Sequence, residues 1–217
     1  MSQRIVLIHA TSLAVAPVNE TFARQWPDAE ISNLLDDVLS HDRGKVTTLT
    51  PEFYQRIDLL VDYAVSINAA AILFTCSAFG EAIDASAETH ALPILKPNEA
   101  MFEAVLEKSN NIVMLATFAP AVPAMEAEFR EMAAVKQSKA TITTVVVAGA
   151  RDALSAGNTA RHNQLIVEAG RMHQHADVLV LAHFSMEVAF EELKSAVTCP
   201  VLSSPQAAVA KLKRLMR

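Results

Sequence analysis

The second half of this sequence repeats the first at a constant spacing. RIVLIHATSL is matched by NIVMLATFAP, AAAILFTCSA by ADVLVLAHFS, and ALPILKPNEAM by TCPVLSSPQAA. Three residue pairs share an offset of 107 (112 minus 5 in the first pair): Ile5 and Ile112, Cys76 and His183, and Pro93 and Pro200. Because one offset joins three separate strand-like segments, the pattern indicates two structurally equivalent lobes.

The repeated segments alternate with amphipathic stretches, which predicts parallel βαβ units. We therefore expect an α/β fold of two pseudo-symmetric lobes, each a small, mainly parallel four-stranded sheet flanked by helices. The expected bounds are 1–97 for the N-terminal lobe and 98–204 for the C-terminal lobe, with a last helix at 205–217 that packs back on the N-terminal lobe. Ligands of such sheets bind beyond the carboxyl ends of the strands. The active site is therefore expected in the cleft between the lobes, with Cys76 on one wall and His183 on the other.

Charge and composition narrow the possible partners. The chain has 24 acidic and 18 basic residues, a net charge of −6, and no basic run before the C-terminal KLKRLMR. This charge pattern lacks the basic patch of a nucleic-acid-binding protein and favours a small metabolite as the partner.

No segment reaches the ~20 apolar residues of a membrane span, and the N-terminal apolar run is too short for a signal peptide. We expect a cytoplasmic protein with both cysteines reduced, and a homo-oligomer by default.

The residues TCSAFG, LPILKPNEAM, LATFAP and LAHFSM resemble the aspartate/glutamate/hydantoin racemase superfamily, which includes arylmalonate decarboxylase and maleate isomerase. The resemblance spans nearly the whole chain. It implies that each lobe supplies one cysteine at the end of its third strand, and that the pair moves a proton at Cα without metal or cofactor. Cys76 matches the first cysteine, but His183 occupies the second position. Cys199 aligns with Leu92, ahead of a strand, and does not replace it.

Cys76 and His183 are the expected catalytic residues. A cysteine between a strand and a helix start can have its pKa depressed by backbone N–H groups and the helix dipole. The competing interpretation is a buried, inert thiol. His183 can act as general acid or base near neutral pH, or it can only hydrogen-bond the substrate.

Hydroxyl side chains beside the predicted strand ends are candidate substrate-binding groups, because hydroxyls and helix-start amides can hold carboxylate oxygens. Each could equally be an ordinary helix cap. The candidates are Thr11, Ser12, Thr75, Ser77, Thr117 and Ser185. Glutamate racemases, which the chain resembles, usually carry an acidic residue after the first strand. HATS stands there in this chain, which argues against a standard ammonium site.

Several charged residues and histidines are interpreted as surface or core residues and not as site residues. Lys96 and Arg151 lie just past strands and could pair with a second carboxylate, but solvated surface is favoured for both. His9 is interpreted as a core histidine. His162, His173 and His175 have the wrong spacing for metal ligands on one helix face. Neither a metal nor a cofactor is expected, and the sequence lacks the nucleotide, zinc and serine-hydrolase motifs.

These observations favour a cofactor-independent racemase or epimerase of amino acids or related carboxylic acids, with Cys76 as the acid/base. One alternative is a single-cysteine isomerase or decarboxylase, in which Cys76 is a nucleophile or the sole proton donor. A third is a metabolite-binding protein without turnover.

Overall fold

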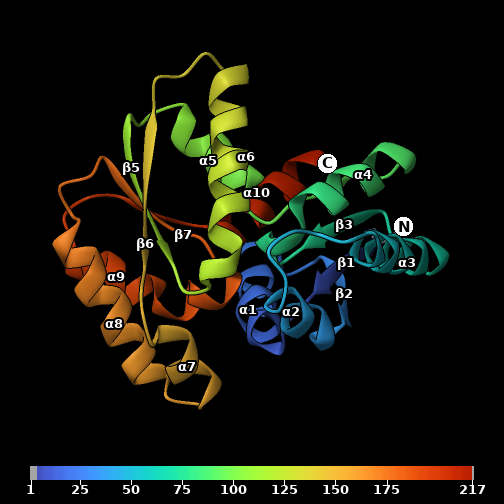
Figure 1. The fold of residues 1–217 in the computed structure, drawn as a ribbon, viewed down its shortest axis with the longest axis horizontal. Coiled ribbons are helices and arrows are strands. Elements are labelled where there is room, and N and C mark those ends of the chain that lie inside the picture. Colours follow the sequence, from blue (N-terminus) through green and yellow to red (C-terminus); the bar gives the residue numbers. More distant parts are fainter. Residues whose placement is uncertain (1–3, 217) are drawn as a thin grey trace.

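The computed structural model of the protein describes residues 4–216, and these form two four-stranded parallel sheets flanked by helices (Figure 1). The first sheet has the order β2-β1-β3-β4, with strands β1 (Arg4–His9), β2 (Glu30–Leu35), β3 (Ala71–Phe74) and β4 (Ile94–Leu95). The second has the order β6-β5-β7-β8, with strands β5 (Asn111–Ala116), β6 (Thr141–Val146), β7 (Val178–Leu181) and β8 (Val201–Ser203). The expected two-lobed α/β fold is confirmed.

Helices pack on the faces of both sheets. Those of the first half are α1 (Val15–Gln25), α2 (Asp37–Arg43), α3 (Pro51–Ser66), α4 (Gly80–Thr89) and α5 (Glu99–Leu106). Those of the second are α6 (Val122–Val135), α7 (Ala150–Ser155), α8 (Thr159–Met172), α9 (Phe190–Ala196) and α10 (Ser204–Leu215). Every residue of β3 and β7 is buried. Burial on both faces of a parallel sheet explains why these strands are uninterrupted apolar runs.

The register in which the strands pair follows the sequence repeat. Ile5 pairs with Ala71 in the first sheet, and Ile112 pairs with Val178 in the second. Each residue of the second pair lies 107 positions after its equivalent in the first pair. The second strands depart from this offset, because Ile31 of β2 and Ile142 of β6 are 111 positions apart (142 minus 31). The repeat therefore aligns the ends of the first and third strands, whereas the segments around β2 and β6 differ between the lobes.

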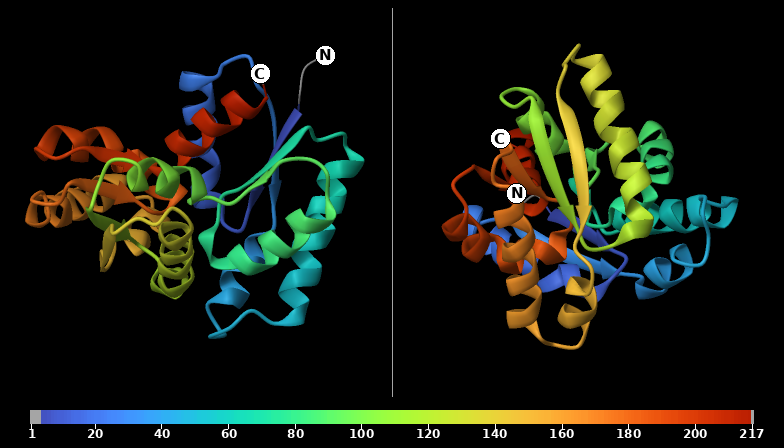
Figure 2. Two further views of the ribbon diagram at one scale, coloured as in Figure 1. Left: turned by 90° about the horizontal axis from the view of Figure 1, so that it is seen from above. Right: turned by 60° about the vertical axis from the view of Figure 1, so that its left-hand side comes forward.

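The last helix, α10, lies against α1 and α5 (Figure 2). Its residues Val209 and Leu212 join an apolar cluster that contains Ile5 and Leu7 of β1. Lys211 forms ion pairs with carboxylates of α5 at 2.7 Å. The chain thus leaves the second sheet at β8 and ends against the first.

One apolar cluster continues from the first sheet to the second. It contains Val6 of β1 and Met114 of β5, and the rings of Phe102 and Phe129 meet edge to face at 5.4 Å. The two lobes therefore pack directly on each other. None of the helices within residues 4–216 is long and apolar enough to cross a membrane.

Candidate active site

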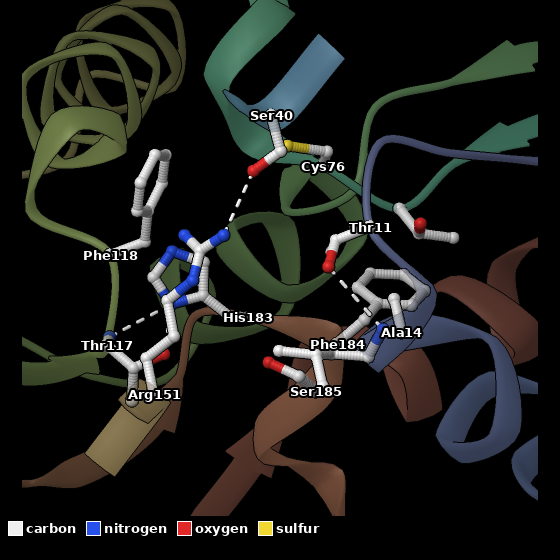
Figure 3. A pocket seen from close by; sticks show the side chains of 12 residues that line it. Thr11, Ala14, Ser40, Cys76, Thr117, Phe118, Arg151, His183, Phe184 and Ser185 are labelled. Atoms are coloured by element: carbon white, nitrogen blue, oxygen red, sulfur yellow. Dashed lines mark hydrogen bonds between the residues drawn. The ribbon is translucent and has the colours of Figure 1, made fainter. Parts of the chain in front are cut away.

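A small cavity lies where the carboxyl ends of both sheets meet (Figure 3). It measures about 30 Å³, which is room for about one water molecule. Its lining comes from both lobes and consists of Thr11, Leu13, Ala14, Ser40, Thr75, Cys76, Thr117, Phe118, Arg151, His183, Phe184 and Ser185. Cys76 and His183, which the repeat placed at equivalent strand ends, therefore line one cavity.

Cys76 follows β3 and precedes a short 3-10 turn, η2 (Ser77–Phe79). Its extended backbone ends the strand, its side chain makes no cap hydrogen bond, and the backbone N–H of Ala78 in the turn lowers the pKa of its thiol. This is the strand-to-helix position that the sequence predicts.

The expected depression of the Cys76 pKa is wrong for this structure. Burial raises the pKa of the thiol above its ordinary value, and this effect exceeds the lowering by the Ala78 N–H and by the cations Arg151 and Arg43. A thiolate at this partly buried position loses much of its hydration, and the neutral form is favoured. The resting group at neutral pH is therefore a thiol, which is a proton donor.

His183 begins the corresponding 3-10 turn after β7, η4 (Phe184–Ala189). The backbone N–H of Thr117 donates to its Nδ1 at 3.1 Å, and the Thr117 hydroxyl lies 3.3 Å from the same atom. Because Nδ1 accepts a backbone proton, the neutral ring carries its own proton on Nε2. Nε2 is buried and has no hydrogen-bond partner within residues 4–216. His183 therefore offers an unpaired N–H donor.

The pKa of His183 is lowered to about 4, first by burial and then by the neighbouring Arg151 guanidinium. The imidazole is consequently neutral at physiological pH. A ring that is already protonated on its free nitrogen donates hydrogen bonds but does not take up a proton as a base. Of the two roles left open for His183, this geometry favours hydrogen bonding to the substrate.

The His183 pKa predicts a pH-dependent stability. An unfolded chain protonates this histidine near its ordinary pKa of about 6.5, whereas the folded protein does so only near 4. The unfolded state then binds more protons in this window, so stability falls as the pH falls through it. Between about pH 7 and about pH 4.5, we expect the free energy of unfolding to fall less for His183→Gln than for wild type. Urea unfolding at each pH measures this free energy.

His175→Gln, a substitution at an exposed histidine, is the matched control and should follow wild type. An acid loss in His183→Gln as large as that of wild type would contradict the buried neutral imidazole. The comparison uses the difference between two pH values, so a constant cost of the substitution cancels.

Arg151 crosses the cavity from the C-terminal lobe to the N-terminal lobe (Figure 3). Gly149 precedes α7 with a left-handed φ of 75°, which turns the chain after β6. The Nη2 of Arg151 donates to Ser40 Oγ at 3.0 Å, and its Cζ lies 4.1 Å from the centre of the Phe118 ring. The sequence interpretation of Arg151 as solvated surface is wrong, because β6 and α7 direct it inward.

The candidate hydroxyl residues divide into two groups. Thr11, Thr75, Thr117 and Ser185 line the cavity, whereas Ser12 and Ser77 are not among its lining residues. Ser12 is exposed in the turn after β1, and Ser77 is buried in η2. Thr11 also accepts a 3.5 Å hydrogen bond from Leu13 N, as a cap would.

The remaining candidates lie elsewhere. Lys96 is not solvated: its side chain is 17% exposed and pairs with Asp84 at 2.9 Å and with Glu128 at 3.4 Å. His9 is a buried core histidine, 2.8 Å from both Thr75 Oγ1 and Asn33 Oδ1. Cys199 packs at the edge of a separate apolar cluster. Among residues 4–216, no three His, Cys, Asp or Glu side chains come together as a set of metal ligands.

The cavity contains one cation and no carboxylate in its lining. Arg151 stays charged at neutral pH, while the Cys76 thiol and His183 are neutral. The site therefore suits an anion, held by a guanidinium and several hydroxyls. Sequence reasoning missed Ser40, because its segment has no motif of its own, and gave no role to Phe118 and Phe184, although they stand inside LATFAP and LAHFSM.

Solved structures with the same fold were found by comparison of coordinates. A glutamate racemase from Bacillus anthracis is 13% identical, with a TM-score of 0.77 over 99% of this chain and 81% of that chain. An aspartate racemase from Picrophilus torridus is 16% identical, with a TM-score of 0.75 over 99% and 94%. A double variant of arylmalonate decarboxylase is 20% identical, with a TM-score of 0.64 over 99% and 92%.

No family model and no curated protein matches the sequence. The chain shares the two-lobed fold of the aspartate/glutamate racemase superfamily, as its sequence resemblance implies. At these identities the comparisons establish the fold alone.

Proposed function

We propose that the protein is an enzyme that moves a proton at the carbon next to a carboxylate, as racemases and related isomerases and decarboxylases do, with Cys76 as the proton-transferring group. The observation that carries the proposal is the convergence of a neutral thiol, a neutral imidazole N–H and one guanidinium on a single cavity without a carboxylate. The shared fold with racemases and arylmalonate decarboxylase supports this reaction class.

In the proposed reaction, Arg151 and the cavity hydroxyls bind the substrate carboxylate. When a second carboxylate on the adjacent carbon leaves as carbon dioxide, its bonding electron pair stays on that carbon, and negative charge spreads onto the oxygens of the remaining carboxylate. The Nε2–H of His183 donates to one of these oxygens, and a buried donor aimed at developing charge is effective because no water competes. The Cys76 S–H then protonates the carbon, and the resulting thiolate regains a proton from solvent.

The geometry favours proton delivery from one face of the substrate. Racemisation needs a second group on the opposite face that can accept a proton. His183 would be that group in a racemase, but its Nδ1 already accepts the Thr117 N–H, and its low pKa disfavours the imidazolium. A single-thiol reaction, such as protonation after decarboxylation or isomerisation, is therefore favoured over symmetric two-base racemisation.

The cavity also indicates a substrate class. A free α-amino acid carries an ammonium group that would need an anionic partner, and none of the lining residues is acidic. We therefore infer a carboxylic acid without a free amino group. A cavity of about 30 Å³ is small for such a molecule, so we expect Arg151 to leave Ser40, or the lobes to separate, when the substrate binds.

The proposal is tested with a panel of carboxylic acids in deuterium oxide: amino acids, 2-aryl and 2-alkyl acids, and the corresponding malonates. We expect deuterium at Cα in the products from malonates without an amino group, and one enantiomer in excess, because one thiol delivers the proton. Nuclear magnetic resonance and chiral chromatography measure both. Saturable binding without deuterium incorporation would instead support a binding protein.

His183→Gln gives the matched comparison for this panel. Glutamine keeps a hydrogen-bond donor but does not shuttle a proton at neutral pH. A donor role for His183 predicts a modest loss of rate with no change in the enantiomer that is formed. A loss confined to one enantiomer would show that His183 is the second acid/base, and would favour the two-sided racemase.

A further inference from the structure

A second hollow lies between the lobes, apart from the cavity that holds Cys76. It measures about 260 Å³, and none of its lining residues lines the first cavity. The lining consists of Arg43, Thr47, Thr48, Leu49, Ala78, Gly80, Glu81, Pro123, Ala124 and Ala127. The first seven belong to the N-terminal lobe, and the last three belong to the first half of α6.

Arg43, the last residue of α2, is a buried cation with no ion-pair partner among residues 4–216. It is 6% exposed, and its Nε and Nη1 donate to the backbone carbonyls of Ala78 and Val46 at 3.2 and 2.7 Å. Its Nη2 makes no hydrogen bond within residues 4–216, and no carboxylate there forms an ion pair with it. Carbonyl oxygens satisfy two donors but leave the charge uncompensated, and buried charges are normally paired.

Two further features of the hollow favour a negative group. The 14-residue helix α6 begins there, at Val122, so its positive dipole end lies beside Pro123 and Ala124; of its first N–H groups, that of Val122 already donates to Ala119 O, and Pro123 has none. The hydroxyls of the exposed residues Thr47 and Thr48 are on the opposite side of the lobe interface. Cation, helix terminus and hydroxyl donors thus surround one space.

Glu81 sets a limit on the charge of the occupant. Its carboxylate also lines the hollow and accepts a hydrogen bond from the Tyr54 hydroxyl at 3.1 Å. Arg43 and Glu81 together make the lining close to neutral. A group with a single negative charge therefore suits the hollow better than a phosphate dianion.

We propose that this hollow is a second binding site, which takes the carboxylate of a small molecule between Arg43 and the start of α6. A bound carboxylate contacts both lobes and so bridges them. It also offsets one of the two cations that lower the pKa of Cys76, and occupancy therefore favours the protonated thiol. The site depends on none of the residues assigned to the reaction above.

The test is a titration of the isotopically labelled full-length protein with sodium acetate, followed by amide chemical shifts. Sodium chloride at equal ionic strength is the reference, and sodium phosphate is the comparison anion. We expect saturable shifts at Gly80, Ala124 and Ala127 with acetate, and weaker ones with phosphate. Shifts confined to Thr117 and Ser185, or no saturation beyond the chloride response, would overturn the proposal.

Three variants localise the effect. Arg43→Gln should weaken acetate binding by at least about tenfold, because a charged hydrogen-bond donor is lost. Thr48→Asp, at an exposed position, should do the same by adding a negative charge without disturbing the core. Arg151→Gln should leave these shifts unchanged. Binding that survives both Arg43→Gln and Thr48→Asp but disappears in Arg151→Gln would assign acetate to the first cavity and overturn the second site.

Discussion

Replacing Cys76 with serine is expected to lower the proton-transfer rate by at least about 10³-fold while the protein stays folded. Serine retains the approximate shape of cysteine, but a hydroxyl is a much weaker acid than a thiol and does not protonate the substrate carbon at neutral pH. The measurements are deuterium incorporation for activity, and circular dichroism with thermal melting for the fold. Undiminished turnover in a folded Cys76→Ser protein would contradict the whole site assignment.

Cys199→Ala is the matched control for this substitution. Cys199 is a partly exposed residue at the edge of the apolar cluster that contains Leu193 and Val147. Its truncation should lower stability by about 1 kcal/mol and leave the rate unchanged. A loss of rate without a melting shift would move the reactive thiol to Cys199.

Arg151→Gln is expected to raise KM for a carboxylate substrate by about 10²-fold, because the cavity loses its only cation within the described lining. Glutamine keeps a polar side chain but provides neither the charge nor the paired donors of a guanidinium. Steady-state kinetics separates KM from kcat. Removal of the guanidinium should also raise the pKa of His183, because Arg151 is one of the two causes that lower it.

Two control variants show whether a change in KM comes from the loss of the Arg151 guanidinium. Arg130→Gln removes a 65% exposed arginine that pairs with Glu126 on α6, and should leave KM unchanged. Ser40→Ala removes the partner that holds Arg151 in the substrate-free protein, and should lower KM if that contact competes with substrate. An Arg151→Gln enzyme with wild-type KM would show that the carboxylate binds elsewhere.

The placement of Cys76 and His183 at one cavity follows from the sequence. A period-two or uninterrupted apolar run specifies a strand locally, and strand ends in a repeated lobe are equivalent by construction. The offset of 107 therefore located both residues at matching strand ends without any knowledge of packing. The same argument does not locate Ser40 or Arg151. These residues lie in the segments after β2 and β6, where the offset between the lobes is 111 and not 107.

The chemical state of the site was decided only by the tertiary structure. From sequence, Cys76 was expected to be an activated thiolate and His183 a possible base. Burial instead raises the pKa of the Cys76 thiol, and the Thr117 N–H, brought beside His183 by the pairing of β5 with β7, leaves the imidazole proton on Nε2. Strand positions depend on local apolar patterning, which a sequence displays. Protonation depends on desolvation and on donors far away along the chain, which exist only once the lobes have packed.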